Sequence, residues 1–193
     1  IYDHVVGVDP DRPGWKGPYT VNDPFHEPLV LFGFLSAVTD ELELVTGILI
    51  LPQRQTVLAA KQAAEVDLLN EGRFRLGLGL GWNEPEYEAL GKEFANRGRR
   101  IEEQVTILRK LWTQQRVSYE GEWERIPDVG LTLLPEQQPI PIWMGGSADP
   151  VLRRIARTAD GWFPQHEPGP ELNAQLESLR QYLADEGRSL EDL

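Results

Sequence analysis

The chain has no cysteine and a single methionine, Met144, among its 193 residues. Without thiols it forms no disulfide bond and no thiolate metal site, and this composition favours a cytoplasmic protein over a secreted one. Apolar runs long enough to span a bilayer are also missing. Basic residues are few, since 19 Lys and Arg stand against 31 Asp and Glu and give a formal net charge of −12. Nucleic acid and anionic membranes are therefore poor partners for this chain.

What is present is the composition of an ordinary globular domain. Hydrophobic residues make up 40% and charged residues 26%, which argues for a packed core rather than for disorder. The length fits one domain, so residues 1–193 are treated as a single unit. The chain opens in "IYDHVV" without an initiator methionine, and we expect it to be a piece of a longer protein.

Strand-like and helix-like segments alternate along the chain. Short apolar runs that end at glycine or proline predict strands over 42–51, 74–80, 140–146 and 161–164. Helical patterns predict helices over 28–38, 55–72, 97–113, 147–160 and 170–186. Residues 117–126 alternate around a glycine and predict a hairpin. With "IYD" as the end of a first strand, this order predicts a parallel sheet with helical crossovers, either doubly wound or a (β/α)8 barrel.

Two of these helices have apolar stripes at helical spacing. In the helix 55–72 the stripe is Val57, Ala60, Ala64 and Leu68, and Gly72 is expected to cap the C-terminus. In the helix 97–113 the stripe is Ile101, Val105, Leu108 and Trp112. Both stripes are expected to face the core.

The stretch "GRFRLGLGLGWNEPEYEALG" contains glycine at every second position of a predicted strand, at Gly77, Gly79 and Gly81. Its spacing is G-x-G-x-G and not G-x-G-x-x-G, and no acidic residue follows in the required context, so it does not predict a dinucleotide-binding loop. Alternate residues of a strand face opposite sides, so the leucines share one face and the glycines the other. The glycine face predicts either tight packing or a bare surface for a flat ligand.

Two turns follow strand ends and precede helices. After the glycine-rich strand, Asn83 and Glu86 have the spacing of an N-terminal capping box. In "MGGSADP", the Gly-Gly-Ser turn presents backbone N–H groups that can bind a phosphate, and Ser147 can either cap the helix or bind that phosphate. In parallel α/β proteins such turns lie at the sheet edge where ligands bind.

Several motifs in order resemble one family. They are "DHVV", "VTGILILPQRQTVLAAKQAAEVDLLNEGRFRLGLGLGWNEPEYEALG", "RGRRIEEQVTILRKLW", "PIPIWMGGSA" and "ADGWFP". Together they closely resemble the bacterial luciferase-like monooxygenase superfamily, and within it the oxidoreductases that depend on coenzyme F420, a deazaflavin. The resemblance implies a (β/α)8 TIM barrel, present here only in part, from about strand 2 to strand 6. It also implies that residues 114–138, a hairpin and a proline-rich connector, are an insertion within the barrel domain.

The resemblance further implies a deazaflavin site at the C-terminal mouth of the barrel. The catalytic candidates are His4, which suits proton transfer, and Asp3, as an orienting partner for His4 or for the backbone. A non-proline cis peptide is expected at Gly47–Ile48, in a bulge that backs the ring. The implied cofactor-binding residues are Thr46, Gly47, Ile48, Gly79, Gly81, Trp82, Asn83, Gly145, Gly146 and Ser147. Trp82 stands where some deazaflavin dehydrogenases have a catalytic glutamate.

The implied reaction is hydride transfer between coenzyme F420 and a small organic substrate. The loop from Gly7 to Asn22, with Trp15 and Tyr19, is expected either to cover the substrate as a lid or to be an ordinary surface loop. Cations for the cofactor tail would come from Arg54, Lys16 or Arg12, although solvated surface charge is the more ordinary role for each. His26 and His166 are expected at the surface, and family members are often homodimers.

Two alternatives stay open from the residues alone. One keeps the fold and uses FMN, with reduced-flavin oxygen chemistry, as a monooxygenase. The other is a shortened barrel that binds flavin or nothing and does not catalyse a reaction. The intact glycine turns favour a catalytic protein, and the missing strands favour the non-catalytic one.

Overall fold

The computed structural model describes all residues from 1 to 193 and is organised around one parallel sheet. Its central strand is β3 (Phe74–Gly79), which pairs with β1 (Leu44–Val45) and β2 (Leu49–Ile50) on one side. On its other side β3 pairs with β6 (Ile142–Gly145), and β6 pairs with β7 (Gly161–Phe163). All four pairings are parallel, which confirms the predicted parallel sheet. The sheet has two free edges and does not close on itself.

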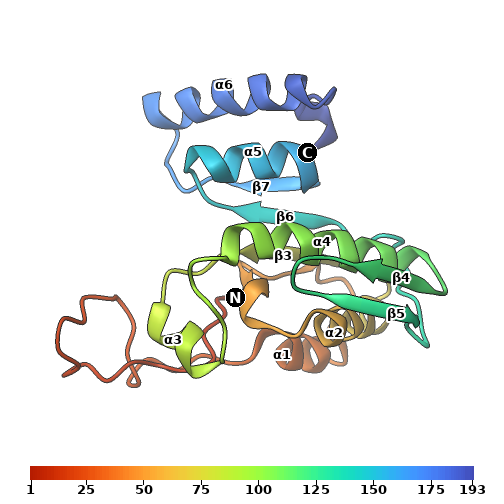
Figure 1. Cartoon of the computed structure of the whole chain (residues 1–193), viewed down its shortest axis with the longest axis horizontal. Helices are drawn as coiled ribbons and strands as arrows, with labels where there is room; N and C mark the ends of the chain where they lie inside the picture. The colour runs from red at the N-terminus through yellow and green to blue at the C-terminus, as the bar shows by residue number, and fades with distance from the viewer.

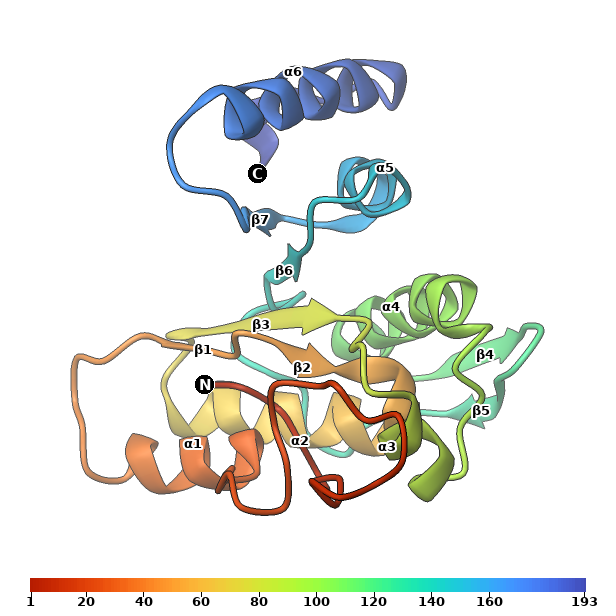
Figure 2. The same cartoon turned by 90° about the vertical axis from the view of Figure 1, so that its left-hand side faces the viewer.

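The helices pack side by side in chain order along this sheet. The five longest are α1 (Pro28–Ser36), α2 (Thr56–Leu69), α4 (Arg97–Thr113), α5 (Asp149–Thr158) and α6 (Pro170–Asp185). Each contacts the next, from α1 to α6, with α5 and α6 stacked beyond β7 (Figure 1). In Figure 2, β7, β6 and β3 lie one below another, and α5 and α4 flank them on one side. None of the helices combines the length and the apolar character needed to cross a membrane.

Five short elements complete the chain. The helix α3 (Glu84–Ala89) follows β3, and 3₁₀ turns occur at η1 (Leu51–Gln53) and η2 (Leu190–Asp192). The strands β4 (Val117–Glu120) and β5 (Arg125–Val129) form an antiparallel hairpin outside the main sheet, against α4. The predicted hairpin is thus confirmed, and it extends three residues beyond Ile126.

The prediction of one continuous strand over 42–51 is wrong, because the strand is interrupted in its middle. It is divided into β1 and β2, and the cis peptide expected at Gly47–Ile48 lies between them. The Thr46 hydroxyl donates to Gly77 O at 2.7 Å, and the Gly47 N–H donates to Ile1 O at 2.9 Å. These bonds replace the regular ladder where the strand is interrupted. The N-terminal "IYD" runs beside this break but forms no strand of its own.

The two predicted apolar stripes have different outcomes. All four stripe residues of α4 are buried, as expected. In α2, Ala60 and Ala64 are buried, but Val57 and Leu68 are only partly so. The buried arc instead includes Ala59, Ala63 and Val66, because α2 packs between α1 and α4 and needs small residues on two sides. The C-cap of α2 is Asn70 and not Gly72 as predicted; Gly72 lies two residues further on, with a φ of 75° and its N–H bonded to Asp67 O.

A single large apolar core lies between the sheet and its helices. It contains 30 buried residues, and among them are Leu76 and Leu78 of β3 and Trp112 of α4. The Trp112 indole N–H donates to Ala60 O at 3.0 Å, so this buried polar group is satisfied. The leucines of the glycine-rich strand therefore face the helices, which leaves the other face of β3 to the cavity described next.

Candidate functional site

A cavity of about 720 Å³ opens at the C-terminal ends of β2, β3, β6 and β7. Ligands of parallel α/β sheets bind at this edge. The cavity is lined by Tyr2, Asp3, His4, Tyr19, Gly47, Ile48, Ile50, Gly79, Leu80, Gly81, Trp82, Gly145, Gly146, Ser147, Ala148, Val151, Phe163, Pro164 and Gln165. Most of the residues predicted for the site are thus brought together, although Thr46 and Asn83 do not line the cavity. Thr46 is buried and supports β3, and Asn83 is buried at the start of α3.

The glycine face of β3 is not bare, contrary to one of the two predictions for it. A side chain at Gly79 would meet Ile48, with its Cβ 2.5 Å from Ile48 Cδ1. Gly81 lies against Ile50, and Gly77 lies against the Thr46 carbonyl and the Phe163 ring. The small residues therefore admit neighbouring side chains of the interrupted strand. A flat ligand would lie against the Ile48 side chain and not directly on the glycines.

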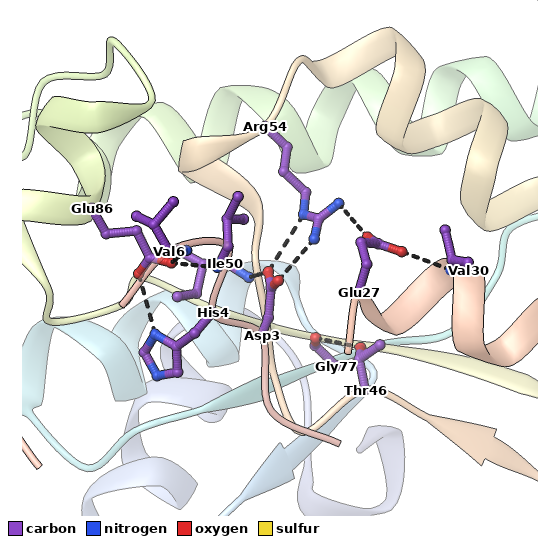
Figure 3. Close-up of polar contacts among 11 residues, drawn as sticks. Asp3, His4, Val6, Glu27, Val30, Thr46, Ile50, Arg54, Gly77 and Glu86 are labelled. Carbon is purple, nitrogen blue, oxygen red and sulfur yellow. Dashed lines mark hydrogen bonds and ion pairs between the residues drawn. The ribbon is translucent and has the colours of Figure 1, made fainter. Parts of the chain in front are cut away.

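Asp3 fixes the backbone beside the cavity. Its side chain is 2% exposed, and its carboxylate accepts hydrogen bonds from the Ile50 N–H at 2.8 Å and from Arg54 Nη2 at 2.8 Å (Figure 3). Arg54 also donates to Glu27 at 2.7 Å, and Glu27 caps α1 through the Val30 N–H. Burial lowers the pKa of Arg54, but the charges of Asp3 and Glu27 outweigh this and raise it above its ordinary value.

This network corrects two predictions. Asp3 orients the backbone, as one of its two predicted roles, but it makes no hydrogen bond to His4. Arg54 is committed to two carboxylates and does not line the cavity, so it is not a cation for a cofactor tail. Lys16 and Arg12 do not line the cavity either.

Glu86 is the site residue that sequence reasoning missed. Its side chain is fully buried, and its two carboxylate oxygens accept from Val5 N at 2.6 Å and pair with His4 Nδ1 at 3.2 Å (Figure 3). Burial opposes ionisation, but the hydrogen bonds from His4 and Val5 lower the pKa of Glu86 below its ordinary value. The predicted capping box is wrong, because Glu86 turns toward the N-terminal segment and Asn83 makes no side-chain capping bond.

Aromatic rings surround His4 at the mouth of the cavity. Its imidazole centroid lies 4.9 Å from Phe25, 5.2 Å from Tyr19 and 5.7 Å from Trp82. Trp15 stacks on Trp82 with centroids 5.7 Å apart. The loop 7–22 therefore contacts the cavity rim through Trp15 and Tyr19, and its motion as a lid stays a prediction.

His4 is the one histidine at the cavity. His26 is exposed, as expected. His166 is partly buried and pairs with Glu171, 2.8 Å away, and it does not line the cavity. Proton transfer inside the cavity therefore has one histidine candidate.

The turn before α5 presents free backbone donors to the cavity. Gly146 has a φ of 130°, and its carbonyl accepts from the Trp162 indole N–H at 2.8 Å. The N-cap of α5 is Ala148, which rules out the first of the two roles predicted for Ser147, that of capping this helix. The N–H groups of Ser147 and Ala148 donate no hydrogen bond within the chain. Such a helix start favours a phosphate group.

The cavity fits a flavin-type molecule on two observations. The Ile48 side chain gives an apolar surface for a ring, and the turn 145–148 gives donors for a phosphate. No Lys or Arg lines the cavity. Recognition of an anionic group would then rest on backbone N–H groups, the α5 dipole and the Ser147 hydroxyl.

The chain is similar to known proteins over most of its length. Residues 13–193 match the family model described as luciferase-like monooxygenase. The chain is 38% identical over 181 residues to an uncharacterized protein of Mycobacterium tuberculosis, covering 93% of this chain and 62% of that protein. It is 32% identical over 172 residues to the FMNH(2)-dependent dimethylsulfone monooxygenase of Pseudomonas putida, covering 87% of this chain and 47% of that enzyme. The chain thus spans about half to two thirds of these relatives.

Two solved structures share the fold. The coenzyme F420 dependent tetrahydromethanopterin reductase of Methanopyrus kandleri aligns with a TM-score of 0.77 at 18% identity, over 86% of this chain and 52% of that one. A riboflavin lyase with modified FMN and riboflavin aligns with a TM-score of 0.78 at 23% identity, over 88% of this chain and 43% of that one. At such identities the likeness concerns the fold alone.

Proposed function

This chain belongs to the luciferase-like monooxygenase family, and on that basis we propose that it is an oxidoreductase that uses coenzyme F420 to transfer a hydride to or from a small organic substrate. The observation that supports this most is one cavity that joins an apolar Ile48 surface, a glycine turn with free N–H groups, and His4. Ile48 would contact the ring, and residues 145–148 would hold a phosphate of its tail. When bound, a deazaflavin supplies a two-electron hydride acceptor or donor.

The chain itself would supply a proton site and exclusion of water. His4 would accept a proton from the substrate, or return one, because a neutral imidazole has one ring nitrogen that accepts a proton. Trp82 and Tyr19 flank His4 and would limit the access of water to the reacting atoms. Substrate would enter under the loop 7–22, whose Trp15 contacts Trp82.

FMN is the second candidate cofactor, and one observation favours it. The monooxygenase of Pseudomonas putida, whose name specifies FMNH(2), is more similar in sequence to this chain than the F420-dependent reductase is, at 32% against 18% identity. In that case the same cavity would hold FMN, and the protein would be a monooxygenase. The third candidate is a non-catalytic protein, and the open sheet is the observation that favours it. The binding experiment below tests this candidate as well.

A titration of the protein with both cofactors separates these candidates. We expect coenzyme F420 to bind with at least tenfold higher affinity than FMN. Quenching of the ligand's fluorescence on binding measures both affinities. Tighter binding of FMN would overturn the choice of cofactor and support the monooxygenase. Binding of neither would support the non-catalytic alternative.

The phosphate turn can be tested at its exposed N-cap, Ala148. Ala148→Asp should weaken binding of a phosphate-bearing cofactor about tenfold or more, since like charges about 4 Å apart repel by roughly 1–4 kcal/mol at a protein surface. Both Asp and Ser are favourable N-cap residues, so Ala148→Ser is a matched neutral control that should bind normally. Calorimetry of the two variants with FMN or coenzyme F420 measures the difference.

The phosphate-free forms of the ligands complete this test. Riboflavin or the deazaflavin core without its tail should bind equally to Ala148→Asp and Ala148→Ser. If Ala148→Asp lost the same affinity for ligands with the phosphate and for ligands without it, the turn would not contact the phosphate.

We also propose that the open sheet is part of a (β/α)8 barrel. Its parallel strands with helical crossovers and its TM-scores of 0.77 and 0.78 against the two larger structures support this. A crystal structure with a further parallel strand hydrogen-bonded to β7 would support the barrel, and one with a solvent-exposed β7 edge would argue against it.

A further inference from the structure

We propose that Glu86 is a positioning residue that holds the neutral His4 ring with its proton on Nδ1, so that Nε2 is the atom that exchanges a proton with the substrate. The proposal rests on the proposed function for the role of His4 in the reaction. The tautomer itself can be measured without any reaction.

Glu86 contacts the N-terminal segment through both of its carboxylate oxygens. One oxygen, Oε1, accepts from Val5 N at 2.6 Å and more distantly from Val6 N at 3.4 Å. The other oxygen, Oε2, lies 3.2 Å from His4 Nδ1. The Glu86 side chain is fully buried and that of His4 is 9% exposed, so water competes little for this contact.

The tautomer follows from donor and acceptor counting. An ionised carboxylate only accepts hydrogen bonds, and the lowered pKa of Glu86 keeps it ionised at neutral pH. A ring nitrogen facing it must therefore carry a proton, which makes Nδ1 the donor. In a neutral imidazole the other nitrogen is then the acceptor. His4 Nε2 lies on the far side of the ring from Glu86 and makes no hydrogen bond within the chain (Figure 3).

The ring and its backbone are held from two further directions. Phe25 and Trp82 pack edge-on to the imidazole and restrict its rotation. The preceding residue, Asp3, binds the Ile50 N–H and Arg54. The backbone on either side of His4 is thus anchored by a buried carboxylate, that of Asp3 before it and that of Glu86 after it.

The consequence for the reaction is a defined proton path. In the oxidation of a substrate, His4 Nε2 would accept the proton of the O–H or N–H bond that breaks, and a bound cofactor would take up the hydride from the adjacent carbon. The resulting imidazolium faces Glu86 through Nδ1–H as an ion pair, and in the reverse direction it returns the proton. Glu86 itself gains and loses no proton.

Nitrogen-15 NMR of the wild-type protein is the first test. The chain has only three histidines, so the ring signals of His4 can be assigned with His26→Gln and His166→Gln variants. At alkaline pH, where the ring is neutral, we expect His4 to be mainly protonated at Nδ1, with a pyridine-type signal from Nε2. A neutral ring protonated mainly at Nε2 would overturn the proposal without any variant.

Glu86→Gln is the second test. The glutamine oxygen should keep the shorter bond to Val5 N, which turns its NH₂ group toward His4 Nδ1 and moves the ring proton to Nε2. We expect the tautomer to invert and kcat to fall about 100-fold, the size of effect expected from general acid–base catalysis. Cofactor affinity should change less than twofold, and Glu86→Asp should retain the Nδ1–H tautomer.

Glu88→Gln is the matched control, since Glu88 lies on the same helix but is 79% exposed and outside the cavity. It should leave the His4 signals and kcat unchanged. An unchanged tautomer in Glu86→Gln would contradict the proposal. If no substrate turns over with either cofactor while the tautomer inverts as expected, the proposed function fails and the positioning role of Glu86 stands.

Discussion

Replacing Arg54 with alanine should lower the free energy of unfolding by about 3–5 kcal/mol, the usual loss when one partner of a buried ion pair is removed. Arg54 is 14% exposed and pairs with Asp3, whose side chain is 2% exposed, and with Glu27. Without the guanidinium, the buried Asp3 carboxylate keeps the Ile50 N–H as its remaining donor. Urea unfolding followed by tryptophan fluorescence measures the loss.

Arg153 offers a matched control on the surface. It pairs with Asp149, and the two side chains are 51% and 58% exposed. Arg153→Ala should cost less than about 1 kcal/mol, because exposed ion pairs contribute little. Equal losses in the two variants would mean that Arg54 acts only as surface charge. The double variant Arg54→Met with Asp3→Asn should recover part of the loss, since it removes the unpaired buried charge.

Gly77→Ala should destabilise the protein by about 3 kcal/mol, at the upper end of the usual range for an overpacked site. The added Cβ would overlap the Thr46 carbonyl and lie 2.8 Å from Phe163 Cε2. The Thr46 carbonyl is backbone next to the strand break, and the Thr46 hydroxyl is itself bonded to Gly77 O. Relief would therefore require β3 to move away from the interrupted strand.

Gly33→Ala is the control for this substitution. Gly33 lies inside α1, and nothing lies within 4 Å of an added Cβ there. This variant should gain about 0.5–1 kcal/mol from helix propensity. Thermal melts of both variants give the comparison, and a neutral Gly77→Ala would show that β3 tolerates side chains on this face.

Local patterns were sufficient for most of the fold. The helix 97–113 was predicted with its observed bounds and its buried stripe, because a helix packed on one face leaves a clear 3.6-residue period. The order of strands and helices gave the parallel sheet. The cis peptide at Gly47–Ile48 was expected from the family resemblance alone, since no local pattern predicts it.

The errors occur where distant residues decide a local structure. Glu86 has the spacing of a capping residue, but a partner 82 positions earlier in the chain, His4, takes its carboxylate. The side chain that covers Gly79 is Ile48, and its position depends on an interruption of a strand that reads as continuous. Burial of Glu86 and its neighbours could not be read from hydrophobicity, since charged residues are rarely buried.

The anchoring of His4 by residues far along the chain has a consequence for the order of folding. The segment around His4 makes one main-chain hydrogen bond to the sheet region, from Gly47 N to Ile1 O, and its other anchors come from residues 50, 54 and 86. These contacts close loops of 47, 51 and 81 residues, and each loses chain entropy before it stabilises anything. During synthesis the segment around His4 is made well before Glu86. It therefore becomes anchored only after β3 and α3 have formed. Placement of the histidine is therefore a late event in folding, because it depends on residues as far along the chain as Glu86.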